Sequence, residues 1–86
     1  MTSAREQSAD GGTHYLTLTV VAECYSVEVR WVREVYEFGL LGTGRVVAGE
    51  PAIATVMLER VAVIRRMQLQ AGLNLAGVAL LLEEME

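Results

Sequence analysis

The sequence predicts a mainly helical domain, in which two short helices joined by a tight turn precede a small β wing and two further helices. Apolar residues recur at the spacing of amphipathic helices in three segments between residues 28 and 85. Gly39 and Gly72 directly follow two of these segments, where a left-handed C-terminal cap is expected. The segment from Leu41 to Pro51 instead carries three glycines and the only proline, which favours turns and short strands.

The N-terminal part is expected to contribute a tail and a strand. Residues 1–14 lack the apolar content of a folded segment, so the sequence predicts a disordered tail there and a single domain over residues 15–86. In Tyr15-Leu16-Thr17-Leu18, the leucines alternate with Tyr15 and Thr17, which carry hydroxyl groups, and this alternation favours a short strand. Residues 1–13 hold no apolar run that could act as a signal peptide.

The first helix is expected over residues 20–25, with Thr19 as its N-terminal cap. Val21 and Cys24 then share its inner face. Cys24 is the only cysteine, so an intramolecular disulfide cannot form. We interpret Cys24 as a small core residue, because no histidine lies nearby in the sequence to activate it as a nucleophile.

The second helix is predicted from Glu28 to Phe38, after a short turn at Ser26-Val27. Its apolar positions are Trp31, Val32, Val35, Tyr36 and Phe38, and its opposite stripe is Arg30, Arg33, Glu34 and Glu37. Gly39 is expected to end it, with Leu40 folding back on the core. Two short helices joined by so tight a turn form a helix-turn-helix unit.

A wing and two more helices are expected next. Val46-Val47 is predicted to form one arm of a hairpin, with Leu41 near the other arm. A helix over residues 55–71 has Leu58, Val61, Ile64 and Leu69 as inward positions and Glu59, Arg60, Arg65, Arg66 and Gln70 as outward ones. Asn74 is expected to cap a last helix over residues 75–85.

The last helix is apolar nearly all round, whereas a surface helix of a small domain should carry a polar face. We therefore predict that it contacts a second copy of the chain or a partner. The candidate oligomer face consists of Leu75, Val78, Leu81, Leu82 and Met85. In the alternative interpretation, this short chain wraps the helix inside its own core.

Composition limits the possible functions. The 86 residues allow one domain at most, and 7 basic against 11 acidic residues give a net charge of −4. An acidic chain repels phosphate, so strong nonspecific affinity for nucleic acid is not expected. The longest apolar run, Val78 to Leu82, is too short to cross a bilayer. A cytoplasmic location is the resulting expectation.

Two groups of residues carry a family resemblance that covers residues 15–85. Val27, Arg33 and the segment Glu37-Phe38-Gly39-Leu40-Leu41 resemble the second helix and wing entry of the MerR-like winged helix-turn-helix superfamily. Trp31-Val32, Glu34-Val35 and the segment from Gly72 to Leu80 resemble its chaperone-modulator (CbpM-like) branch. The resemblance implies an adaptor that binds the J-domain of a DnaJ-type co-chaperone and regulates its work with a DnaK-type chaperone.

Two kinds of partner remain open for the second helix. Since the resemblance implies a basic J-domain helix as partner, an acidic surface would complement it. The candidate partner-binding residues are Glu28, Arg30, Trp31, Glu34 and Glu37. The alternative is a DNA-binding regulator, with Arg30, Arg33 and Arg45 on phosphates or bases.

Charge on the second helix favours a protein partner over DNA. Residues 28–38 hold two arginines and three glutamates, and the spacing of Arg30–Glu34 and of Arg33–Glu37 allows mutual neutralisation. Protein is therefore the preferred partner. A solvated helix face of mixed charge is the plainer interpretation of the same residues.

Catalysis finds little support in the sequence. His14 is the only histidine and adjoins the expected tail. Gly42-Thr43-Gly44 is not followed by the lysine and helix of a phosphate-binding loop. The sequence therefore predicts a protein that is not an enzyme and that uses neither a cofactor nor a metal.

Overall fold

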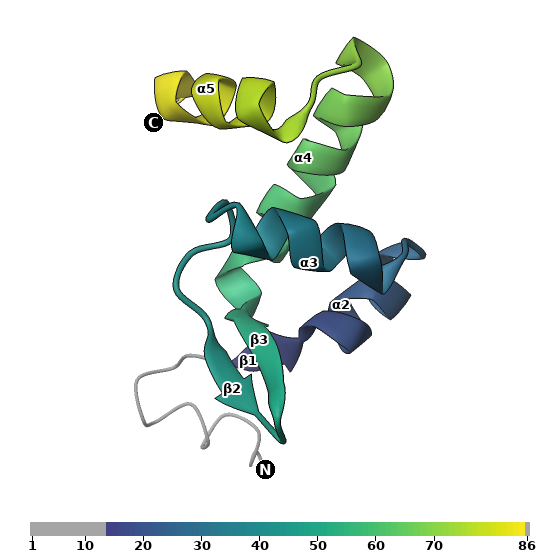
Figure 1. Cartoon of the computed structure of the whole chain (residues 1–86), viewed down its shortest axis with the longest axis vertical. Coiled ribbons are helices and arrows are strands. Elements are labelled where there is room, and N and C mark those ends of the chain that lie inside the picture. The colour runs from purple at the N-terminus through teal and green to yellow at the C-terminus, as the bar shows by residue number, and fades with distance from the viewer. Residues whose placement is uncertain (1–13, 86) are drawn as a thin grey trace, which may run out of the picture.

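The computed structural model describes residues 14–85. Residues 1–13 of the tail expected over residues 1–14 lie outside this range, as does Glu86. Four α-helices and a three-stranded antiparallel sheet make up the described part of the chain (Figure 1). The elements in order are β1 (Tyr15–Thr17), α2 (Leu18–Tyr25), α3 (Val29–Glu37), β2 (Arg45–Val47), β3 (Glu50–Ala54), the 3-10 helix η2 (Thr55–Met57), α4 (Leu58–Ala71) and α5 (Leu75–Met85). This arrangement is compatible with a helix-turn-helix unit followed by a wing and two further helices.

Helix α2 begins earlier than its sequence suggests. The Thr17 side chain accepts a hydrogen bond from the Val20 amide at 3.4 Å and is the N-terminal cap, so the expectation of Thr19 in that role was wrong. The helix ends at Ser26, which adopts a left-handed conformation with φ 55°. The Val27 amide donates to the Ala22 carbonyl at 3.0 Å, which completes the tight turn into α3.

Helix α3 ends as its sequence predicts. Gly39 has φ 89°, and its amide donates to the Tyr36 carbonyl at 3.0 Å. The Leu40 amide donates to the Val35 carbonyl at 3.4 Å, and the Leu40 side chain packs against the core. This pair of bonds satisfies two carbonyls that a helix end leaves without partners, and it turns the chain toward the wing.

Strand β3 lies in the middle of the sheet, between β1 and β2. It is the second arm of the wing, so the expectation that Leu41 lies near that arm was wrong. Leu41 is instead a buried member of the core, where its apolar side chain leaves water. Pro51 pairs with Val46 at a point beyond the last β1 pair, Thr17 with Ala52, so a proline is tolerated in this central strand.

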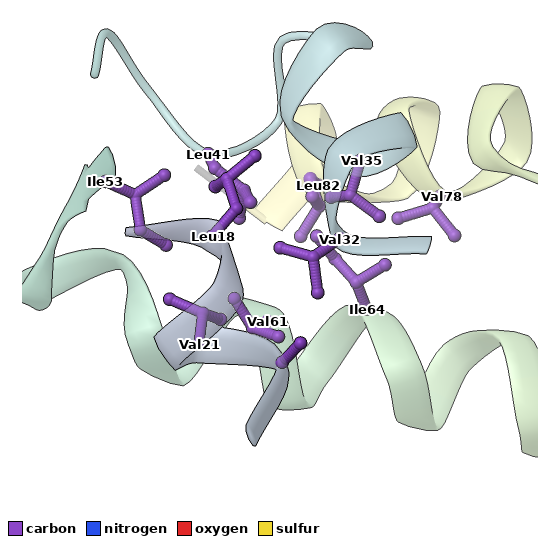
Figure 2. Packing of buried hydrophobic residues seen from close by; sticks show 11 residues of the cluster. Leu18, Val21, Val32, Val35, Leu41, Ile53, Val61, Ile64, Val78 and Leu82 are labelled. Atoms are coloured by element: carbon purple, nitrogen blue, oxygen red, sulfur yellow. The ribbon is translucent and has the colours of Figure 1, made fainter. Parts of the chain in front are cut away.

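One apolar core holds the elements together (Figure 2). Its buried members are Leu18, Val21, Ala22, Val32, Val35, Leu41, Ile53, Val61, Ile64, Val78 and Leu82. The sequence predicted two further members wrongly. Leu69 is 69% exposed, because its position five residues after Ile64 turns it about 140° away from the core face. Cys24 is exposed, because the inner face of α2 is centred on Leu18 and Ala22.

Helix α5 has the predicted bounds and packs on this core. Val78 is fully buried and Leu82 is 6% exposed. The Asn74 side chain accepts a hydrogen bond from the Gly77 amide at 2.8 Å, which confirms Asn74 as the cap. Gly72 ends α4 with φ 66°, as predicted. None of the helices over residues 14–85 is both long and apolar enough to cross a membrane.

The turn of the wing contains a strained alanine. Ala48 and Gly49 join β2 to β3 with φ 51° and 79°, which is the geometry of a type I′ turn. Asparagine tolerates this conformation better than alanine, so we expect Ala48→Asn to raise the free energy of unfolding by about 0.5–1 kcal/mol. Ala48→Val should lower it, because a β-branched residue is the least compatible with positive φ. Chemical denaturation of both variants measures the difference, and equal stabilities would contradict the turn assignment.

Gly44, which directly precedes β2, allows the chain to pass close to Ala52 of β3 and to Tyr36. A Cβ atom at this position would overlap the Ala52 carbonyl oxygen and lie 2.9 Å from Cε1 of Tyr36. We therefore expect Gly44→Ala to destabilise the fold by about 1–3 kcal/mol, as overpacking does elsewhere. Thr43→Ala, at the exposed neighbouring position, is the control and should leave the unfolding midpoint nearly unchanged. A stable Gly44→Ala protein would show that the chain passes at a greater distance.

Candidate partner-binding surface

The polar stripe of α3 is exposed as predicted. Val32 and Val35 bury the opposite side of the helix in the core. The exposed residues of the stripe are Arg30, Arg33, Glu34 and Glu37, and Glu28 lies exposed at the N-terminal end of the helix. The structure therefore exposes one mixed-charge face of α3 to solvent, and the packing of α3 on the core holds this face in place.

The charges on this face are not neutralised within the helix. Spacing suggested that Arg30 pairs with Glu34 and Arg33 with Glu37. In the described residues 14–85, neither pair forms a salt bridge. Three carboxylates and two guanidinium groups thus remain available, and carboxylates are in excess.

A shallow hollow adjoins the C-terminal end of α3. Glu34, Glu37, Phe38 and Leu75 line it, and we call it the Phe38 hollow. Phe38 is 49% exposed, although the sequence pattern assigned it to the apolar face. Leu75 is half-buried and is the first residue of α5. The sequence placed Leu75 in the candidate oligomer face of the last helix and Phe38 on the apolar face of α3, and it did not predict that the two residues line one hollow.

Trp31 lies at the other end of α3 in a different setting. Its indole N–H donates to Oε1 of Gln68 at 2.8 Å, and the guanidinium carbon of Arg65 lies 5.3 Å from the ring centroid. Ser26, Val27, Glu28, Trp31 and Arg65 line a second hollow there. The predicted partner residues thus divide, since Glu28 and Trp31 border one hollow and Glu34 and Glu37 border the other. Trp31 also ties α3 to α4.

The alternative DNA-contact residues lie on two elements. Arg30 and Arg33 are on the exposed side of α3, and Arg45 is on the edge strand β2. The guanidinium carbon of Arg45 lies 5.1 Å from the centroid of the Tyr15 ring. Arg45 is therefore positioned by a cation–π contact across the sheet.

The predicted oligomer face does not remain intact on the surface. Val78 and Leu82 are buried in the core of the chain itself. The alternative interpretation, in which the chain wraps this helix inside its own core, expected such burial. Leu75 is half-buried, while Leu81 and Met85 are 41% and 65% exposed. Met85 and Leu82 border a third hollow with η2 and the start of α4. A contact with a second copy stays a prediction that only Leu81 and Met85 can now support directly.

Comparisons with known proteins identify no relative. No family model, no curated protein and no solved structure matches this chain.

Within residues 14–85, no three histidine, cysteine, aspartate or glutamate side chains gather into a group that could hold a metal ion. The His14 carbonyl accepts a hydrogen bond from the Thr55 amide at 2.9 Å, so its main chain is anchored beside β1.

The Trp31–Gln68 hydrogen bond offers a test of how α3 is held on α4. Trp31→Phe removes the indole donor and keeps most of the ring, and we expect it to cost about 1 kcal/mol of stability. Gln68→Met removes the acceptor. In a double-mutant cycle by chemical denaturation, the two changes should be non-additive by at least about 0.5 kcal/mol. Strict additivity would mean that the bond contributes nothing to the packing of α3 on α4.

Proposed function

We propose that this chain is a cytoplasmic, non-enzymatic adaptor with a MerR-like winged helix-turn-helix fold. It binds the J-domain of a DnaJ-type co-chaperone and regulates or assembles its complex with a DnaK-type chaperone. The observation that carries the proposal is the exposure of Glu34 and Glu37 on α3, beside an exposed aromatic residue. The resemblance of residues 15–85 to the chaperone-modulator branch gives the partner class.

The charge of α3 argues against DNA as the main partner. A helix-turn-helix protein that reads DNA inserts its second helix into the major groove and places cations on phosphates. Here Glu28, Glu34 and Glu37 are exposed along the same helix as Arg30 and Arg33. Each carboxylate near the phosphates would oppose binding, and no internal salt bridge of α3 screens these carboxylates.

A basic protein surface suits the same helix. Complementary charge steers two proteins into encounter and penalises partners of the wrong sign. Phe38 adds apolar area next to the carboxylates, and aromatic residues are enriched among those that dominate binding energy. The J-domain helix that the resemblance implies as the partner is basic and meets the charge requirement.

Charge reversal on α3 tests the proposal. We expect Glu34→Arg/Glu37→Arg to weaken binding to the cognate J-domain by at least about tenfold, because like charges then face each other. Glu83→Arg/Glu84→Arg changes the net charge by the same amount at the exposed end of α5 and is the matched control. Titration calorimetry and pull-down measure both variants.

Two results would contradict the proposal. J-domain binding that survives charge reversal on α3 would remove this helix face from the contact. Retention of the wild-type protein on duplex DNA at near-physiological ionic strength, without any J-domain binding, would favour the regulator instead.

A further inference from the structure

The Phe38 hollow has features that suit a particular kind of partner side chain. Its apolar part comes from two separate elements, Phe38 after α3 and Leu75 at the start of α5. Val32 and Val35 on the inner side of α3 are fully buried, whereas Phe38 is 49% exposed. An exposed aromatic ring beside a second apolar residue offers dispersion contacts that the folded chain itself does not use.

The carboxylates at this hollow do not serve the stability of their own helix. Glu34 and Glu37 lie in the last turn of α3, where the helix dipole is negative and favours cations. No basic residue lies in that turn, and no salt bridge joins either glutamate to another of the residues 14–85. These carboxylates are therefore free to pair with a cationic group of a partner.

We propose that the Phe38 hollow receives a large aliphatic side chain flanked by lysine or arginine, presented by a basic amphipathic helix of the partner. This inference rests on the proposed function, because it names the chemistry that the α3 surface recognises. The aliphatic side chain packs between Phe38 and Leu75. The flanking cation lies over the Phe38 ring and pairs with Glu34 or Glu37.

The choice of a helix as occupant follows from the charge and shape of the site. Apolar and cationic side chains three or four residues apart lie on one side of a helix, so one helix can offer an apolar side chain to Phe38 and Leu75 and a cation to Glu34 or Glu37. Phosphate groups are repelled by the same carboxylates, so the site disfavours nucleic acid. A partner helix that fills the hollow touches both α3 and α5.

Contact with both helices has a mechanical consequence. Only residues 72–74 connect α4 to α5, and the buried residues of α5 are Val78 and Leu82. A partner side chain held between Phe38 and Leu75 would contact both α3 and the N-terminal end of α5. The bound partner therefore restricts the first turn of α5.

The test uses the full chain and a designed peptide. The probe is a fluorescently labelled amphipathic helix of about 18 residues, with leucine and lysine at i, i+3 and i+4 positions on one face. We expect it to bind, and we expect binding to fall at least about tenfold when the lysines are replaced by glutamate or the leucines by serine. Fluorescence anisotropy measures the affinity, and amide chemical shifts should move at the end of α3 and the start of α5.

Variants of the chain locate the binding site. Phe38→Ala and Leu75→Ala should each weaken binding of the peptide about tenfold. Leu69→Ala, which removes an exposed leucine on α4, is the matched control and should have no effect. Glu37→Gln should weaken binding several-fold while its unfolding midpoint stays the same or rises, since a carboxylate leaves the negative end of α3. A purely structural role for Glu37 predicts a lower midpoint instead.

The outcomes separate this inference from the proposed function. If J-domain binding is lost with Glu34→Arg/Glu37→Arg but unaffected by Phe38→Ala, the hollow is not the contact and this inference is overturned. If the peptide binds in a Phe38-dependent way but no J-domain binds, the proposed function is overturned. The inference that the hollow receives an aliphatic side chain flanked by a cation is then retained. Circular dichroism of each variant establishes that the fold is intact, so a loss of binding reports on the hollow.

Discussion

Burial of one small apolar cluster is the constraint on which the rest of the structure depends. Helices α2, α3, α4 and α5 and strand β3 all contribute side chains to it, so no element has a core of its own. A chain of this size buries a modest fraction of its surface, and each shared contact therefore orients two or more elements at once. The direction of every exposed face follows from this cluster. Val32 and Val35, for instance, turn the charged stripe of α3 toward solvent.

The exposed face of α3 combines two properties that rarely favour stability. Its last turn carries carboxylates at the negative end of the helix, and the residue that follows, Phe38, exposes an aromatic ring. In a domain with a thin stability margin, both features are costs that folding alone does not explain. The recognition of a cationic and apolar partner that we propose would account for both features. Glycine and asparagine at the helix ends, by contrast, serve the fold.

Local signals in the sequence predicted much of this fold. Gly39, Gly72 and Asn74 specify helix ends through interactions within a few residues, and the bounds of α5 followed from them. Features that depend on distant segments were not predictable. The pairing of β1 with β3 and the burial of Leu41 depend on residues far apart in the sequence. The Phe38 hollow is the same kind of feature, because its residues meet only when α5 packs beside α3.

The order of strands in the sheet has a consequence for how quickly the chain folds. Strands β2 and β3 are joined by a two-residue turn, so this hairpin closes with a small loss of chain entropy. Strand β1 pairs with β3 across most of the helix-turn-helix unit and the wing, as in the register of Thr17 with Ala52. Long-range pairing of this kind slows folding, whereas short helices and tight hairpins form within microseconds. We therefore expect the β2–β3 hairpin to form before β1 pairs with β3.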